Sequence, residues 1–414
     1  MIHKIASTIY KVSLETITDI CISANYDNVL ESKDYVIHDN YLYILNFQLL
    51  DELIIAEKLT TTEIENIGEL LEKRKDLAER YLKDNKLKLA NKYGNKLSVN
   101  RFWRYKIIEG NKVVEKYAIP ASTIKGVLKS GFLYYFLNNV EYTYTRDKKG
   151  HLNLKELDAN ITTSLYSNNY HAKNYNEFYK NLNNTNIFKN QFSIYEAKQK
   201  NDNIEFEKKA DISEVLNSSD KVFFKNIICS DLILKNGDPI IKKVDRISRK
   251  NNKYGPSQYY ELIQTGSNFI GNIKFLNHMP HDSISKKLWL TLISIFYNDF
   301  KQSEIGLVDI CIEGLRKYSK LLIETEMKYF SEKLIKLNQK SNFNFYSKLL
   351  DMHKKGDIII KIGKSGIMAK SFMVFDSKNI KLKDNFAPYT INIDDCNKAP
   401  IGWVRLKIEE LKDK

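Results

Sequence analysis

Two lysines one helical turn apart, Lys125 and Lys129, stand in the part of the sequence best suited to binding a phosphate group. They fall within residues 119–130, where Pro120 ends the preceding element and Ser122 is placed to cap the first turn of a new helix. The free N–H groups of a first turn favour anions, so the two lysines would add to a region of positive potential. The alternative is an amphipathic helix whose lysines are simply solvated.

The same helix contains two glycines, Gly126 and Gly131, although each costs about 1 kcal/mol relative to alanine in a helix interior. Glycines at such positions indicate that another backbone comes close. One buried stripe is predicted at helical spacing: Ile124, Val127, Leu128, Gly131 and Tyr135. We therefore expect the helix to pack on a sheet and to face a phosphate backbone.

A basic stretch precedes this helix. Residues 86–106 contain seven basic side chains and no acidic one: Lys86, Lys88, Lys92, Lys96, Arg101, Arg104 and Lys106. Four aromatic residues are interleaved with them: Tyr93, Phe102, Trp103 and Tyr105. Cations beside aromatic rings can pair phosphates while the rings stack on unpaired bases. Alternatively the cations cover a solvated strand, and for the aromatic residues a place in the core is the better interpretation.

A second basic stretch, residues 221–255, has nine Lys or Arg against three Asp. Within it Arg246 and Arg249 lead into a polar loop that ends at Gly255 and Pro256. Such a loop could lie along a single strand of RNA, because phosphate contacts supply much of the affinity for nucleic acid.

A third segment, residues 362–371, carries two glycines and two lysines: Gly363, Lys364, Gly366 and Lys370. It is not a nucleotide-hydrolysing P-loop, because with Lys370 as the motif lysine the two glycine positions hold Lys364 and Ala369. A short glycine loop after a strand can still cradle phosphate through backbone N–H groups.

No pattern predicts a cofactor or a metal site. Pro280 interrupts the spacing between His278 and His281, and the pair Asp394-Asp395 in a polar loop is expected to be solvated. The cysteines are far apart and form no C-x-x-C pair: Cys21, Cys229, Cys311 and Cys396. This distribution is typical of a protein in a reducing compartment.

The composition favours a polyanionic partner. The 414 residues include 65 Lys and Arg against 51 Asp and Glu, a net charge of +14. Nucleic acid and an acidic membrane surface are both compatible with that excess, although lysine-rich genomes also produce basic proteins without such a purpose. No apolar run approaches the length of a membrane span and residues 1–5 do not open a signal peptide, so we expect a cytoplasmic protein with no membrane partner.

Alternating and helical patterns succeed one another along the chain and predict an α+β fold. We expect hairpins at residues 35–45, turning at Asp39-Asn40, and at 259–275, turning at 265–267. Helical character covers residues 48–93 and returns after Pro280, where Met327, Phe330 and Leu334 form one stripe. Two strands should flank residues 109–111, and further strands are expected at 221–235, 240–248, 357–362 and 403–408.

Two motifs carry a family resemblance. Residues 119–130, IPASTIKGVLKS, resemble the I-P-G-S-S-I-K-G-x-L-R signature of RAMP proteins, the RNA-binding subunits of CRISPR effector complexes. Ala121 replaces the usual glycine, and Lys129 stands at or near the arginine. Residues 399–406, APIGWVRL, resemble the P-x-G-W-V-x-L ending of the fifth Csm subunits of type III-A complexes. Residues 362–371 also resemble the C-terminal glycine-rich loop of RAMP proteins.

The resemblance implies two ferredoxin-like (RRM-like) RAMP domains, residues 1–235 with an insertion at about 141–203, and residues 236–414 with a helical insertion at about 283–340. It implies a non-catalytic subunit that binds the 3′ part of the crRNA and caps the stack of backbone subunits. Its partners would be crRNA, other Csm subunits, and a recruited host nuclease that trims the crRNA in antiviral defence. The predicted RNA-binding residues are Arg101, Arg104, Ser122, Lys125, Lys129, Arg246, Arg249, Gly363, Lys364, Gly366 and Lys370.

The alternative is a RAMP-type endoribonuclease that processes crRNA. RAMP nucleases cut with a loop aspartate or a histidine near the N-terminus, and the candidates here are His3, Asp27, Asp34 and His38. None of them stands in a recognisable catalytic string. The sequence therefore predicts no catalytic residue.

Overall fold

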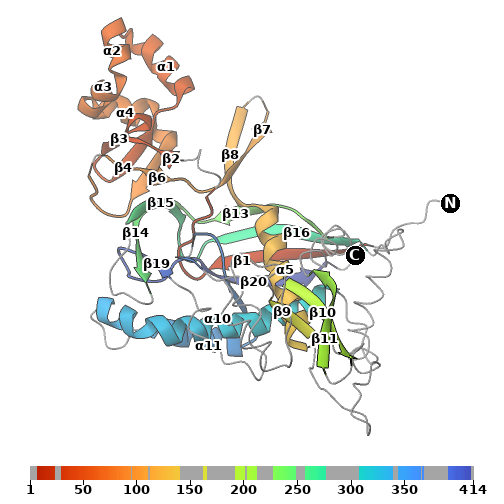
Figure 1. Cartoon of the computed structure of the whole chain (residues 1–414). Coiled ribbons are helices and arrows are strands. Elements are labelled where there is room, and N and C mark those ends of the chain that lie inside the picture. Colours follow the sequence, from red (N-terminus) through yellow and green to blue (C-terminus); the bar gives the residue numbers. More distant parts are fainter. Residues whose placement is uncertain are drawn as a thin grey trace, which may run out of the picture.

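The computed structural model describes residues 7–23, 29–94, 96–110, 112–139, 162–165, 192–200, 203–211, 227–248, 257–276, 307–338, 344–364, 366–367 and 390–411. In these residues, strands and helices are mixed along the chain and form two large sheets with helices packed against them (Figure 1). The predicted α+β class is confirmed. Among the described helices, none is both long enough and apolar enough to cross a membrane.

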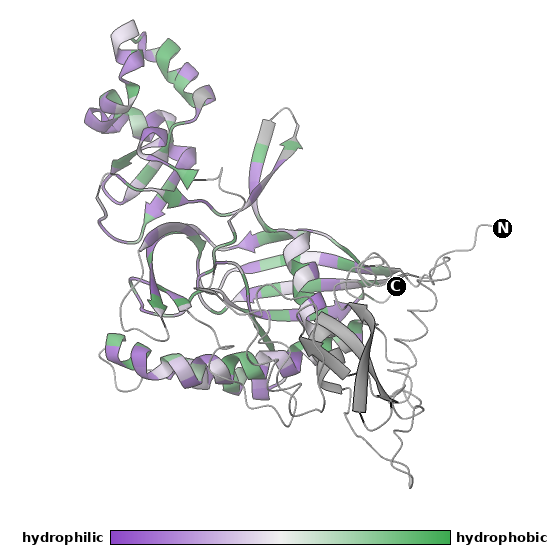
Figure 2. Cartoon of the chain, in the orientation of Figure 1, coloured by the Kyte–Doolittle hydropathy of each residue, from purple (hydrophilic) through white to green (hydrophobic). Residues whose placement is uncertain are grey.

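The first sheet brings the two ends of the described chain side by side. Its strands, in order, are β17 (Ile358–Lys361), β20 (Trp403–Glu410), β1 (Ser7–Thr16), β16 (Asn268–Leu276), β13 (Leu232–Asn236), β8 (Lys112–Ile119) and β7 (Arg104–Glu109), and β12 (Ile227–Cys229) also pairs with β16. Hydrophobic and hydrophilic residues alternate along these strands (Figure 2). Val12 and Leu14 of β1 are fully buried on one face, whereas Lys11 is exposed on the other.

The second sheet is built around β14 and β15. Its order is β2 (Val29–Leu30), β6 (Val99–Asn100), β15 (Gln258–Ile263), β14 (Pro239–Ser248), β5 (Lys86–Leu89), β4 (Tyr41–Ile44) and β3 (Tyr35–His38), with β19 (Thr390–Asp394) on β14 and β18 (Gly366–Ile367) on β19. The predicted hairpin turning at Asp39-Asn40 is confirmed, with Asp39 at φ 52°. A third, small sheet contains β9 (Thr162–Leu165), β10 (Phe192–Lys200) and β11 (Asn203–Asp211).

The hairpin predicted at residues 259–275 is wrong. β15 belongs to the second sheet and pairs with β14, whereas β16 belongs to the first sheet and pairs with β1. The turn between them crosses from one sheet to the other, and Asp19 holds it by accepting hydrogen bonds from the N–H and hydroxyl of Thr265 at 2.9 and 3.0 Å. The alternation of apolar and polar residues identified both strands correctly, but it does not show which strands they pair with.

Each large sheet contains strands from both sides of residue 235, so the two sheets do not correspond to the two predicted domains. The insertion predicted at 141–203 lies largely outside the described residues, apart from β9 and β10. In the insertion predicted at 283–340, α10 (Leu307–Asn338) is helical as expected.

The signature helix α5 (Ala121–Asn139) crosses the buried face of the first sheet and packs along α10 (Figure 1). A Cβ at Gly131 would overlap the Cys311 carbonyl oxygen of α10, so the predicted close approach of a backbone is confirmed at this glycine. The backbone that comes close belongs to another helix, α10. At Gly126 no atom of the described residues lies within 4 Å of a Cβ, so within this part of the chain that glycine has no such packing role.

Four helices form a subdomain at the edge of the second sheet: α1 (Phe47–Glu57), α2 (Thr61–Glu65), α3 (Ile67–Lys73) and α4 (Lys75–Tyr81) (Figure 1). Leu53, Leu71 and Leu77 pack there with Val36 and Tyr43 of β3 and β4. The helical region predicted to end at residue 93 is too long, because α4 is followed by a short 3-10 turn at Lys83–Asn85 and β5 begins at Lys86. Another 3-10 turn, Ser32–Asp34, precedes β3.

A buried ion pair joins α10 to the edge strand β17. Lys361 Nζ lies 2.6 Å from Glu326 Oε1, and neither side chain is more than 1% exposed. The Tyr346 hydroxyl of α11 (Phe345–Lys354) donates to Glu326 Oε2 at 3.2 Å, and the Lys361 ammonium lies 5.5 Å from the centroid of the Trp403 ring. Four elements therefore meet at one charged pair inside the predicted apolar stripe of α10.

Replacing Glu326 by glutamine should lower the free energy of unfolding by about 3–5 kcal/mol, because Lys361 would keep a buried charge without its carboxylate. A lower urea midpoint would measure this loss. The double variant Glu326→Leu with Lys361→Met should recover most of it, since both charges are then removed. A wild-type midpoint for Glu326→Gln would contradict this role.

Candidate nucleic-acid interface

The first turn of α5 is capped from another part of the chain. The helix begins at Ala121, directly after Pro120, and the Ala121 N–H donates to Asp231 Oδ1 at 2.7 Å. Ser122 is the second residue of the helix and is exposed, so its predicted capping role is wrong. The sequence could not point to Asp231, because a cap 110 residues away leaves no local pattern.

Asp231 reaches the helix because a strand is interrupted beneath it. β12 and β13 both lie beside β16, and the break between them falls opposite Gly271. A Cβ at Gly271 would lie only 2.7–2.8 Å from Ser230 Oγ and the Asp231 carbonyl oxygen, so only glycine allows the chain to pass so closely. Ser230 closes the break by donating its N–H to the Asn272 carbonyl oxygen and accepting from the Asn272 N–H, at 2.9 and 2.8 Å.

The two signature lysines lie on the first turns of the capped helix. Lys125 and Lys129 are half-buried, and the exposed Gly126 lies between them. Burial raises the pKa of the nearby Cys229 thiol to about 11, and the charge of Lys125 partly offsets that rise. The two lysines add their charge to the positive end of the helix dipole, and no atom of the described residues lies within 4 Å of a Cβ at Gly126 between them.

Arg101 and Arg104 contact an internal carboxylate instead of open solvent. Arg104 forms an ion pair with Glu261, and Arg101 Nε lies 3.8 Å from the same side chain, which is 0% exposed. The Tyr117 hydroxyl and the Phe102 N–H also donate to Glu261, at 2.5 and 3.1 Å. Burial, and then the charge of Glu261, raises the pKa of Tyr117 well above its usual value. In the structure these guanidinium groups therefore hold the base of the β7–β8 hairpin.

The aromatic residues of the basic stretch are divided. Phe102 is fully buried, and Tyr93 packs on Tyr259 with ring centroids 5.1 Å apart, so the predicted core role is confirmed for these two. Trp103 and Tyr105 are partly exposed and stack on each other, with centroids 6.2 Å apart.

Gly363 is required by a close approach within the chain. Its φ is +70°, and a Cβ would overlap the Cys21 carbonyl oxygen, which accepts from the Lys364 N–H at 2.8 Å. Lys364 itself is exposed, and its carbonyl oxygen accepts from Asn392 Nδ2 at 2.8 Å. Asn392 Oδ1 in turn accepts from Arg246 Nε at 3.4 Å.

These contacts bring five of the predicted residues to one place. Cys21 and Ile22 follow β1, and their carbonyl oxygens accept from the N–H groups of Lys364 and Trp103 at 2.8 and 2.6 Å. The five residues around this link are Arg101, Arg104, Arg246, Gly363 and Lys364. Ser122, Lys125 and Lys129 form a separate group on α5. Gly366 of β18 pairs with Ile391 of β19. Arg249 and Lys370 lie outside the described residues.

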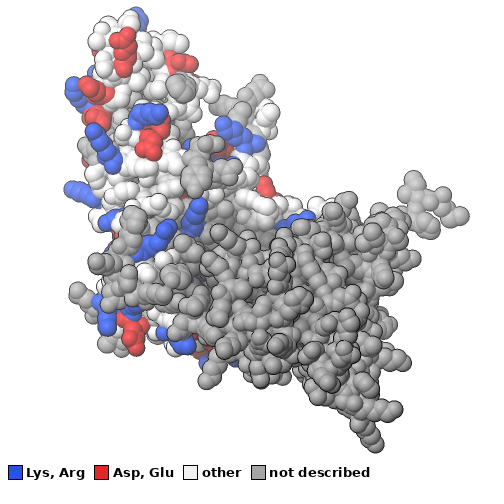
Figure 3. Space-filling view, in the orientation of Figure 1, with Lys and Arg blue, Asp and Glu red and all other residues white. Residues whose placement is uncertain are grey.

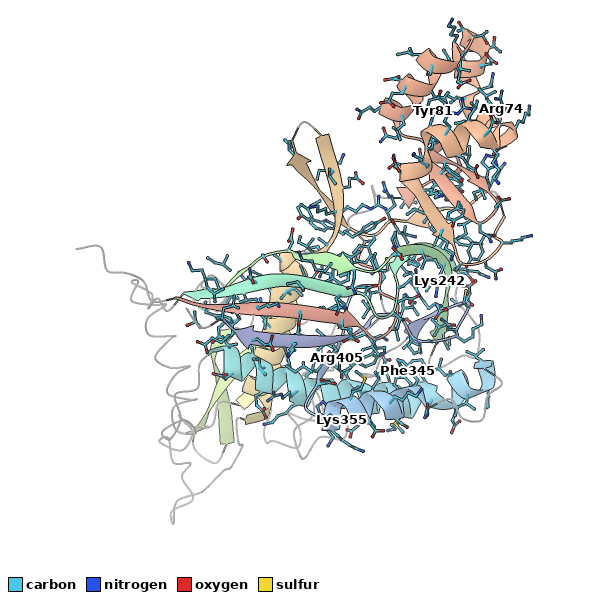
Figure 4. The ribbon with its side chains drawn as sticks, turned by 180° about the vertical axis from the view of Figure 1, so that it is seen from behind. Arg74, Tyr81, Lys242, Phe345, Lys355 and Arg405 are labelled. Atoms are coloured by element: carbon cyan, nitrogen blue, oxygen red, sulfur yellow. The ribbon has the colours of Figure 1, made fainter. Side chains whose placement is uncertain are left out.

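A lysine that the sequence analysis passed over lies beside this place. Lys242 is almost fully buried, with Nζ 2.6 Å from Asp19 Oδ2 and 3.6 Å from Asp394 Oδ1 (labelled in Figure 4). Burial raises the pKa of Asp394. Asp394 also accepts from the N–H groups of Cys396 and Asn397 at 3.0 and 2.7 Å, so the expectation of a solvated acid is wrong for this residue.

Asp394, Asp395 and Cys396 lie close enough together to be compared with a metal site. The carboxylate oxygens of both acids already have partners, however. Asp394 contacts Lys242 and the N–H groups of Cys396 and Asn397, and Asp395 accepts from the Tyr93 hydroxyl at 3.1 and 3.2 Å. Two nuclease candidates also have structural partners. His38 Nε2 lies 2.6 Å from the Leu71 carbonyl oxygen, and Asp34 accepts from the Glu31 N–H at 2.8 Å. His3 and Asp27 lie outside the described residues.

Gly363→Ala should destabilise the protein by about 1–2 kcal/mol, because it adds a clash with the Cys21 carbonyl and a left-handed backbone that alanine avoids. Gly126→Ala is the matched control. It adds the same methyl group in open space on a helix, and should stabilise by about 0.5–1 kcal/mol. Thermal melting of both variants measures the difference. Equal melting temperatures would show that Gly363 is not held by this contact.

No family model matches the sequence, and no curated protein sequence matches it. Solved structures do resemble it, and two of them cover almost the whole chain. The crystal structure of Csm5 from T. onnurineus has a TM-score of 0.56 and 14% identity, covering 95% of this chain and 99% of that chain. A chain of the cryo-EM structure of a Csm–crRNA–target RNA ternary complex, from a type III-A CRISPR–Cas system, has a TM-score of 0.52 and 14% identity, covering 96% and 100%. The chain thus has the fold of Csm5 over almost its whole length.

Proposed function

We propose that this chain is the fifth Csm subunit of a type III-A CRISPR effector complex and binds crRNA without cutting it. The observation that carries the proposal is the extent of the fold similarity, which takes in 95% of this chain and 99% of Csm5. The signature of α5 and the ending at residues 399–406 support it independently, because they are sequence features. In this role the chain binds the 3′ part of the crRNA, caps the stack of backbone subunits and assists trimming by a recruited nuclease.

Two surfaces are proposed to contact the RNA. On α5, Ser122, Lys125 and Lys129 bind phosphates beside the helix N-terminus, where positive potential is already present. Around Cys21, the exposed Lys364 and the half-buried Arg246 supply cations. Gly366 and, outside the described residues, Arg249 and Lys370 remain in the proposed set on the evidence of the sequence alone. Arg101 and Arg104 are proposed to act mainly by positioning, since Glu261 already holds them.

The competing proposal is a crRNA-processing endoribonuclease. His38 is the described histidine nearest to that role, but its Nε2 is committed to the Leu71 carbonyl oxygen, which favours a structural function. A cleavage assay on repeat RNA without metal separates the proposals. We expect no cleavage. Cleavage that is lost in His3→Ala or His38→Ala would replace the proposed function by the nuclease.

Assembly provides the direct test. The tagged chain, expressed with the remaining Csm subunits and a CRISPR array, should purify with those subunits and with short RNAs of regular length. A chain that purifies alone, without RNA, would contradict the proposal.

Lys125→Ala should flatten the salt dependence of binding to single-stranded crRNA by about 0.7 in log K per log salt, the value of one phosphate contact. Base preference should not change, because the contact is to the backbone. The matched control is Lys83→Ala, which removes an exposed lysine from the helical subdomain. Filter binding over a range of salt concentrations measures both slopes. Equal salt-dependence slopes for the two variants would show that Lys125 makes no phosphate contact and is simply solvated on the surface of α5.

A further inference from the structure

The outer two helices of the subdomain are acidic in a basic chain. Residues 47–65, which comprise α1 and α2, contain one basic side chain, Lys58, and five acidic ones: Asp51, Glu52, Glu57, Glu63 and Glu65. Residues 66–85, which comprise α3 and α4, contain five of each sign. The negative charge of the subdomain is therefore concentrated on α1 and α2, which lie at its outer end (Figure 1).

The same two helices expose aliphatic side chains. Ile55 of α1 is 76% exposed and Ile64 of α2 is 38% exposed. Gln48, Asp51, Glu52 and Ile55 are all exposed and follow one another at helical spacing, so Ile55 shares a face with the two acids. The opposite face of α1 is already used, because Leu50 and Leu53 are buried in the subdomain core. An apolar side chain with a charged border is the arrangement of a small protein interface.

Three basic side chains of the subdomain pair with acids outside the face that carries Asp51, Glu52 and Ile55. Arg80 pairs with Glu57 at 3.0 Å, Arg74 pairs with Asp76 at 2.7 Å, and Lys75 pairs with Asp39 at 2.6 Å. Asp51 and Glu52 form no ion pair with any residue that the structure describes. Both acidic and basic side chains are visible among uncharged atoms at this end of the molecule (Figure 3). The face consequently keeps its negative charge and repels a phosphate backbone.

We propose that α1 and α2 form a docking surface for a protein partner, one whose own surface presents Lys or Arg side chains around an apolar contact. The proposal rests on the proposed function, because the partner is then a protein of the effector complex. Complementary charge would guide this partner to α1 and α2 and fix its orientation. Ile55 would supply the desolvated centre of the contact. The subdomain thereby separates protein contacts from the basic surfaces proposed for RNA.

A photo-crosslinking amino acid in place of Ile55 tests the identity of the occupant. The complex is first purified with the unmodified chain, so that its subunits and crRNA are known to be present before the variant is examined. The matched control carries the same amino acid at Lys73, an exposed position on α3. We expect a crosslink from position 55, and not from position 73, to a Lys- or Arg-rich segment of another polypeptide. Crosslinks to crRNA, to a second copy of this chain, or to nothing would overturn the proposal.

Charge reversal tests the electrostatic part. Asp51→Lys combined with Glu52→Lys should weaken retention of the crosslinked polypeptide in the complex by about tenfold at low salt. The control reverses Glu69 and Glu72 to lysine on α3, whose surroundings are electrically balanced, and should leave retention unchanged. All four side chains lie on the subdomain surface, so melting temperatures should stay close to that of the unmodified chain. Equal retention in the two double variants would overturn the charge argument.

Discussion

A single buried carboxylate, Glu261, fixes one sheet of the protein to the other. It stands on β15 of the second sheet, and its partners Arg104 and Tyr117 stand at the base of the β7–β8 hairpin, which belongs to the first. A carboxylate that is 0% exposed is tolerated only when cations and donors surround it, and here two arginines, a hydroxyl and the Phe102 N–H do so. Because β8 continues into α5, the same contact determines where the signature helix begins relative to the second sheet.

Charged groups at other junctions follow the same rule. Lys242 lies between Asp19 and Asp394 where the link after β1 meets β14 and β19, and Lys361 pairs with Glu326 where α10 covers the edge of the first sheet. Such pairs add little net stability, but they disfavour arrangements that would leave a buried charge alone. The net charge of +14 therefore overstates the surface available to RNA, because several of its cations are internal.

Local features of the chain were predictable from the sequence, and distant ones were not. The α5 helix, the turn at Asp39 and the close approach at Gly131 follow from spacing and residue type. The cap from Asp231 and the change of sheet after β15 depend on residues brought together only by the fold. For the candidate site, residue types identified cations correctly but could not separate those facing solvent from those facing a buried acid.

That distinction determines how the protein can recognise its partners. In the basic stretch the Lys86 ammonium lies over the Tyr41 ring at 4.6 Å, Arg104 is held by Glu261, and Phe102 is buried, so these side chains already have partners within the chain or lie in its core. Among the aromatic residues of this stretch, Trp103 and Tyr105 are the pair that is partly exposed and stacked, so the proposed RNA binding would depend mainly on phosphate contacts. Phosphate contacts set position but carry no sequence information. In the proposed role, selectivity for the correct assembly would therefore come from protein surfaces, and the acidic face of α1 and α2 carries the charge opposite to that of the proposed RNA-binding surfaces.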